Sequence, residues 1–173
     1  MKNIRTISVC ALMLALGLVM PFLTAQVPQI GSMLLPMHLP VLLAGYIVGG
    51  APAMAVGAVV PLLRSFIWGM PPLYPTAVAM AFELAAYGFF AGFLYEKSNK
   101  STFSVYASLI GAMLAGRVVW GAVSRVLYTM SGSRFTMQVF IAGAFLNAIP
   151  GIVLQIVLIP VLVMALKRAK IIR

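Results

Sequence analysis

Long apolar segments separated by short polar turns dominate the hydrophobic pattern of this chain of 173 residues. A helix needs about 20 apolar residues to cross a bilayer core of about 30 Å. The predicted spans are approximately 7–22, which is somewhat short, and 74–95, 103–128 and 137–166, which are long enough. A further apolar stretch, 33–68, is too long for one comfortable span and slightly short for two. The pattern therefore predicts an all-α membrane protein.

The apolar stretch 33–68 is interrupted by Gly49-Gly50-Ala51-Pro52, a sequence that favours a turn. Charge decides whether it forms one helix or two. Basic clusters occur at Lys2/Arg5, Lys97/Lys100 and Lys167/Arg168/Lys170. Two short helices place these clusters on one side of the membrane, whereas one helix violates the positive-inside rule. We therefore predict a compact bundle of six membrane-spanning helices with both termini in the cytoplasm, forming a single domain over residues 1–173.

Composition supports the membrane assignment. The hydrophobic fraction is 63%, the charged fraction is 8% and the mean hydropathy is +1.09, against roughly 45–50% apolar and about 25% charged residues in soluble domains. The net charge of +10 fits basic anchors that touch anionic lipid, so no nucleic-acid partner is expected.

The N-terminal segment and the single cysteine bear on whether the chain has a signal peptide, a disulfide or a metal site. Pro21 and the lack of a small-x-small cleavage site favour a retained first helix over a signal peptide. Cys10 can form no internal disulfide, and neither Cys10 nor the lone His38 has the spacing of a metal site. No metal or other cofactor is predicted.

Glu83 is the one residue that interrupts the apolar segment 74–95 with a charge. A carboxylate at membrane depth costs several kcal/mol unless it is paired, neutralised or facing a wet cavity, so it marks a candidate functional site. The segment follows a loop, 69–75, that three prolines stiffen. One reading of Glu83 is purely structural: it pairs with Arg64 or Arg117 and locks two helices together.

Three arginines lie within or near the predicted spans: Arg64, Arg117 and Arg125. One carboxylate cannot balance all three, so positive charge remains in the outer half of the bundle and could receive a carboxylate or phosphate ligand. Arg125 is the weaker candidate because it can extend to the headgroups. Arg117, Gly121, Ser124 and Tyr128 share one helical stripe, which must face a neighbouring helix or a wet cavity.

Other polar and small residues have two readings each. His38, between Pro36 and Pro40 at the outer mouth of a helix, is either a structural hydrogen-bonding residue or part of a site wall. Asn147 serves either as a contact between helices or as a site residue, and Tyr74 is an interface aromatic or a site residue. Ala11 and Ala15 lie four residues apart and would let another helix approach closely.

Together these segments resemble the substrate-binding (S) component of energy-coupling factor (ECF) vitamin transporters, and the pantothenate type most closely. The resemblance rests on Ala11-x-x-x-Ala15, on 34–45 with its Leu-Pro-Met-His-Leu-Pro core, on Pro61-Leu62-Leu63-Arg64-Ser65, and on Gly69-Met70-Pro71-Pro72 with Phe82-Glu83-Leu84-Ala85. Chain length and the six predicted helices agree with it over the whole chain.

The resemblance implies a subunit of a prokaryotic cell-membrane importer that binds a vitamin at its outer face. It implies association with a transmembrane coupling protein and two cytoplasmic ATPases, contact of Ala11 and Ala15 with the coupling protein, and delivery of the vitamin by toppling of the subunit within the membrane. The chain has no Gly-rich Walker-type loop and is not expected to be an enzyme.

Pantothenate has one carboxylate, an amide and two hydroxyls on an aliphatic frame. An arginine would bind the carboxylate, with Arg117 preferred over Arg64 and Arg125 because of its depth, and Glu83, Asn147 or Tyr74 would bind the hydroxyls and amide. The loops 26–37 and 69–75 would cover the site.

Alternative functions are a subunit for another vitamin or precursor, an intramembrane enzyme, and a small channel or scaffold. The enzyme would use Glu83 and His38 as acid and base, but it lacks a metal cluster, a nucleophile with a partner and a second nearby carboxylate. A channel or scaffold would form symmetric oligomers without saturable binding of a small ligand.

Overall fold

The computed structural model describes residues 2–24 and 28–172, and this part of the chain is helical without strands. Residues 26 and 27 of the predicted lid and Arg173 lie outside the described residues. The helices are α1 (Lys2–Val19), η1 (Met20–Thr24), α2 (Pro28–Leu34), α3 (His38–Val48), α4 (Gly50–Trp68), η2 (Leu73–Ala77), α5 (Val78–Glu96), α6 (Thr102–Met130), α7 (Met137–Ile141), η3 (Ala142–Leu146) and α8 (Ile149–Arg168). The all-α prediction is confirmed.

Five helical stretches in the described residues are long and apolar enough to cross a membrane. They are Ile4–Leu23, Gly50–Trp68, Leu73–Glu96, Thr102–Met130 and Met137–Arg168. Helix α3 has 11 residues and extends about 17 Å at 1.5 Å per residue, less than a bilayer core of about 30 Å. The count of six spans therefore stays a prediction.

Gly49 separates α3 from α4, so the apolar stretch 33–68 forms two main helices. Its φ is +91°, a conformation that favours glycine because other residues have a Cβ. A Cβ at this position would lie 2.3 Å from Glu96 Oε1. The turn thus depends on glycine for both its backbone conformation and its space.

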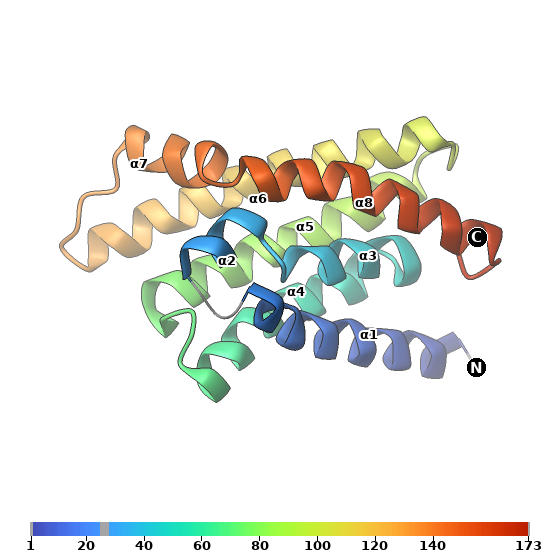
Figure 1. Ribbon diagram of the computed structural model, residues 1–173, viewed down its shortest axis with the longest axis horizontal. Coiled ribbons are helices and arrows are strands. Elements are labelled where there is room, and N and C mark those ends of the chain that lie inside the picture. The colour runs from blue at the N-terminus through green and yellow to red at the C-terminus, as the bar shows by residue number, and fades with distance from the viewer. Residues whose placement is uncertain (1, 25–27, 173) are drawn as a thin grey trace.

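The start of α1 and the end of α8 lie at the same end of the bundle, which we call the terminal end (Figure 1). The opposite end, with α2 and the connections 69–72 and 131–136, is the loop end. The Arg5 side chain donates a hydrogen bond to the carbonyl of Ile171, and Lys167 Nζ donates to the carbonyl of Lys100. Members of the three basic clusters therefore meet at the terminal end.

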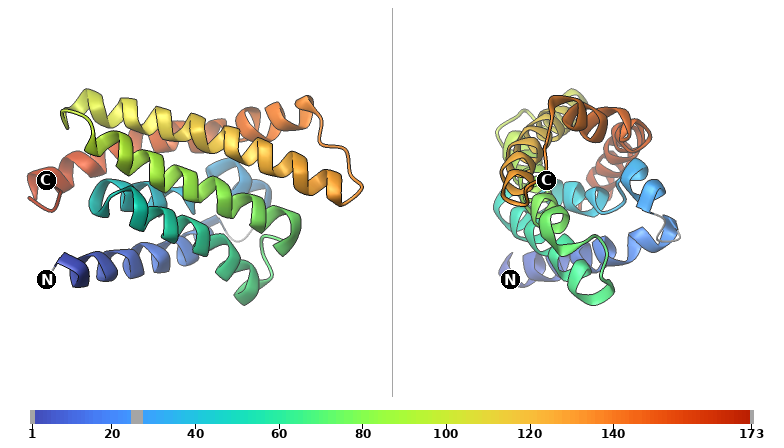
Figure 2. Two further views of the ribbon diagram at one scale, coloured as in Figure 1. Left: turned by 180° about the vertical axis from the view of Figure 1, so that it is seen from behind. Right: turned by 90° about the vertical axis from the view of Figure 1, so that its left-hand side faces the viewer.

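Helix α5 is the centre of the bundle and packs against α3, α4 and α6. Figure 2 shows α4, α5 and α6 running side by side. A Cβ at Gly57 would lie 2.3 Å from the carbonyl oxygen of Leu84, and one at Gly88 would lie 2.6 Å from that of Ala53. Glycine thus lets the α4 and α5 backbones approach closely. This packing fixes the position of α5, and with it that of Glu83.

Large side chains fill the bundle toward the terminal end. The core cluster there joins residues of α3, α5, α6 and α8, among them Leu42, Tyr46, Tyr87, Leu109 and Ile159. Tyr46 donates a hydrogen bond to the carbonyl of Val105, 3.1 Å away. The main cavity lies on the other side of this core, toward the loop end.

One local prediction was wrong. The stretch after the first span, predicted to be a loop, contains α2, which begins at Pro28, a residue suited to the first helical position. The last predicted span, 137–166, lies within one apolar helical stretch, Met137–Arg168, in which α8 restarts after a turn at Asn147-Ala148 with Pro150 in its first turn. Helix α2 rests against this restart, since a Cβ at Gly151 would lie 2.6 Å from the carbonyl oxygen of Met33.

Candidate functional site

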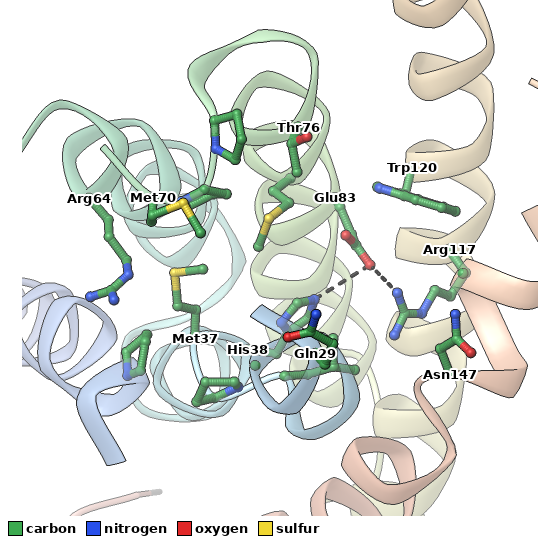
Figure 3. A pocket seen from close by; sticks show the side chains of 18 residues that line it. Gln29, Met37, His38, Arg64, Met70, Thr76, Glu83, Arg117, Trp120 and Asn147 are labelled. Atoms are coloured by element: carbon green, nitrogen blue, oxygen red, sulfur yellow. Dashed lines mark hydrogen bonds and ion pairs between the residues drawn. The ribbon is translucent and has the colours of Figure 1, made fainter. Parts of the chain in front are cut away.

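A cavity of about 490 Å³ opens inside the loop end of the bundle (Figure 3). Its wall is built by η1, α2, the turn before α3, the C-terminal end of α4, the connection after α4, η2, α5, α6 and η3. The lining residues are Pro21, Gln29, Gly31, Leu35, Pro36, Met37, His38, Arg64, Met70, Pro71, Pro72, Thr76, Met80, Glu83, Arg117, Trp120, Gly143 and Asn147. The volume suits a small organic ligand, because such sites span about 300–1,000 Å³.

A buried ion pair forms one wall of the cavity. Glu83 Oε1 on α5 accepts a hydrogen bond of 2.7 Å from Arg117 Nη1 on α6. His38 Nε2, at the start of α3, lies 3.4 Å from the same oxygen. Glu83, Arg117 and His38 are 2%, 4% and 1% exposed. The fold thus brings together three predicted site residues from three helices.

This cluster keeps unused hydrogen-bonding capacity. Figure 3 shows the second carboxylate oxygen of Glu83 directed away from both His38 and Arg117. Within the described residues, Arg117 Nε and Nη2 and His38 Nδ1 have no hydrogen-bond partner. Buried polar atoms are usually paired, so such a concentration beside a cavity indicates a place for water or a polar ligand.

Helical periodicity explains how this wall is assembled. Thr76, Met80 and Glu83 are spaced four and three residues apart, which places them on one face near the start of α5. Arg117 and Trp120 are three residues apart on α6 and line the same cavity. The residues of the predicted stripe on α6 have two different surroundings. Arg117 faces the cavity, whereas Gly121 packs under Phe140, to which a Cβ would come within 2.4 Å.

Arg64 lines the cavity on the side opposite the Glu83 cluster (Figure 3). It is 3% exposed, and its Nη1 donates a hydrogen bond of 2.6 Å to the carbonyl of Leu18. Its guanidinium carbon lies 5.2 Å from the centroid of the Phe22 ring and 5.4 Å from that of Trp68. These cation–π contacts stabilise the charge but leave it without a carboxylate partner in the described part of the chain.

The remaining predicted site residues fall into two groups. Asn147 lines the cavity near Arg117 (Figure 3). Tyr74 and Arg125 are exposed and are not among the described lining residues. Tyr74 instead donates a hydrogen bond of 2.9 Å from its hydroxyl to the carbonyl of Leu127 on α6.

Ala11 and Ala15 lie on the exposed face of α1, together with Leu12 and Leu16. The buried face of the same helix carries Met13 and Gly17, whose packing partners lie on α3 and α4. A second membrane helix could therefore reach the two alanines without displacing the bundle.

Eight lining residues lie in the segments 26–37 and 69–75, which were predicted to cover the site. The lining residues outside both these segments and the predicted site residues are Pro21, Thr76, Met80, Trp120 and Gly143. Thr76 could have been found because it is a polar residue seven positions before Glu83, on the same helical face. Besides lining the cavity, Trp120 packs against Phe140, with ring centroids 6.1 Å apart. The signal in the sequence that Trp120 also lines the cavity was its position three residues after Arg117, on the same helical face.

No cluster of three or more His, Cys, Asp or Glu side chains that could hold a metal ion occurs in the described residues. The donors and acceptors at the cavity include instead two separate guanidinium groups, a carboxylate, an imidazole and amides. This set can bind a small ligand with an anionic group, hydroxyls or an amide.

Comparison with known proteins gave one match. The model of a family described as "ECF transporter, substrate-specific component" matches residues 5–163, most of the chain. A search of the curated proteins and a search of the solved structures gave no significant match.

Proposed function

The chain belongs to the family of ECF transporter substrate-specific components, and we propose that it is the high-affinity binding subunit of an importer for a water-soluble vitamin, pantothenate. Membership makes it a membrane-embedded transport component with a small-molecule substrate and ECF-module partners, not an enzyme. The substrate, the orientation in the membrane and the delivery mechanism are parts of the proposal.

The cavity chemistry supports pantothenate as the substrate. An arginine would bind its carboxylate, and the Glu83 carboxylate and the Asn147 amide would bind its hydroxyls and amide. Methionine and proline side chains between the two polar walls would pack against the aliphatic frame. The observation that carries the proposal is the buried Glu83–Arg117–His38 cluster at the wall of a cavity of about 490 Å³.

Charge supports the proposed orientation. Basic residues from distant segments meet at the terminal end, which the positive-inside rule places in the cytoplasm of a prokaryotic cell. The cavity at the loop end then opens to the outside. In this arrangement α3 adds a sixth span to the five long ones. It is the shortest span, and α1, α4, α5 and α8 shelter it from lipid.

Delivery would proceed by toppling of the loaded subunit on a transmembrane coupling protein driven by two ATPases. Ala11 and Ala15 would contact the coupling protein, since they are small and exposed on α1. The connection 69–75 and the segment 28–37 would cover the loaded cavity, because both contribute lining residues.

A thermal-shift screen of the detergent-purified protein against a panel of vitamins, followed by calorimetry, tests the proposal. A ligand that binds the folded state stabilises it by RT ln(1 + [L]/Kd). A rise in Tm with pantothenate alone is expected. A rise with another vitamin would retain the transport class and discard pantothenate, and a folded sample that responds to no vitamin would refute the binding function.

A further inference from the structure

Arg64 differs from the other cavity arginine in its charge balance. The chain contains two acidic residues. Glu83 is hydrogen-bonded to Arg117 at 2.7 Å, and Glu96 lies at the far end of α5, beside Gly49. Neither carboxylate is therefore available to Arg64.

Burial makes this imbalance costly. Arg64 is 3% exposed, and its described partners are neutral: the Leu18 carbonyl and the faces of Phe22 and Trp68. An uncompensated charge that is removed from water is destabilising unless another group supplies the opposite charge. Because Arg64 lines the cavity, a ligand can supply it.

The cavity also has two different polar walls. Arg64 lies on one side, and Glu83 with Arg117 lies on the other, with Met37 and Met70 between them in Figure 3. The first wall carries an uncompensated positive charge. The second wall is charge-balanced and presents the free carboxylate oxygen of Glu83, an acceptor for hydroxyl or amide donors.

We propose that Arg64, rather than Arg117, binds the anionic group of an elongated ligand, whose hydroxyl or amide donors face Glu83 on the opposite wall. This inference rests on the proposed function and fixes the direction of the ligand within the same site. It differs from the sequence-based preference for Arg117, which was argued from depth alone. Arg117 then acts as the hydrogen-bonding partner that holds the Glu83 side chain in place.

The test compares pantothenate with its neutral alcohol analogue, in which –CH₂OH replaces the carboxylate, by calorimetry on wild type and variants. Hydrogen bonds to charged groups contribute about 1.5–3 kcal/mol, so wild type should prefer the carboxylate by about tenfold or more. Arg64→Gln should abolish most of this preference, and Arg64→Lys should retain part of it because the charge remains. Arg117→Gln should weaken both ligands and keep their ratio.

Arg134→Gln is the matched control, because it removes the same charge from an exposed loop position outside the cavity lining. Its affinities for both ligands should equal those of wild type. If Arg64→Gln keeps the wild-type preference, or if Arg117→Gln alone removes it, the assignment is wrong. If Arg64→Gln does not fold, an unchanged preference in Arg64→Lys together with its loss in Arg117→Gln overturns the assignment as well.

A lipid phosphate could supply the same anionic chemistry to Arg64, so binding is repeated in nanodiscs of phosphatidylcholine alone and with phosphatidylglycerol. Competition by phosphatidylglycerol that Arg64→Gln removes, with the carboxylate preference intact, would assign Arg64 to lipid and overturn the proposal. Equal affinity of wild type for both ligands would overturn the inference alone, whereas a folded wild type that binds no vitamin would overturn the proposed function.

Discussion

Separating Glu83 from Arg117 gives the most quantitative prediction. The two side chains are joined at 2.7 Å and are 2% and 4% exposed, so solvent screens the interaction little. Removing one partner of a buried pair costs about 3–5 kcal/mol, because the other charge stays buried and uncompensated. Replacing both partners removes that charge as well.

The expected pattern follows from this difference. Glu83→Gln and Arg117→Gln should each lower Tm by roughly 6–20 °C, at about 2–4 °C per kcal/mol for a chain of this size. The double variant should be more stable than the sum of the single effects by about 0.5–3 kcal/mol. Pantothenate binding of Glu83→Ala or Arg117→Ala should weaken by at least about tenfold, or about 1.4 kcal/mol.

Thermal unfolding in detergent, followed by the fluorescence of Trp68 and Trp120, measures the stability effects. Calorimetry measures binding at a temperature where each variant is folded. Single variants within about 2 °C of wild type, or strictly additive effects in the double variant, would show that the buried pair does not couple α5 to α6, and the prediction would then be wrong.

Two more predictions concern packing and assembly. Gly57→Ala places a Cβ 2.3 Å from a carbonyl oxygen of α5 and should lower Tm by several degrees, because it separates α4 from α5. The control Ala55→Val, at an exposed position of the same helix, should leave Tm unchanged. Equal Tm values for the two variants would contradict this packing argument. Ala11→Trp or Ala15→Trp should abolish co-purification with the coupling protein and ATPases while vitamin binding is kept, and unchanged co-purification would remove the two alanines from the proposed interface.

Much of the helical architecture could be predicted from apolar periodicity and glycine. The turn at Gly49 followed from the Gly-Gly-Ala-Pro sequence, and the meeting of basic clusters at one end followed from charge. Helix α2 was missed because Gln, Gly and Ser favour loops locally, whereas its packing against α8 is a tertiary effect.

The candidate site, too, could be predicted only in part from the sequence. Glu83 and Arg117 could be identified because charge is rare in an apolar segment. Their pairing, as against a pair between Glu83 and Arg64, depends on helix rotation and packing that residue spacing does not determine. The lining methionines and prolines carry no chemical signal that separates them from core residues, so the extent of the cavity required the fold.

Whether this cavity binds the vitamin is tested by calorimetry of pantothenate on wild type, Thr76→Trp and Val118→Trp. Thr76 lines the cavity, whereas Val118 is an exposed position of α6 outside the described lining and outside the proposed lid. We expect saturable binding to wild type and Val118→Trp and its loss in a folded Thr76→Trp protein. Wild-type affinity in Thr76→Trp would mean that the vitamin does not bind in this cavity.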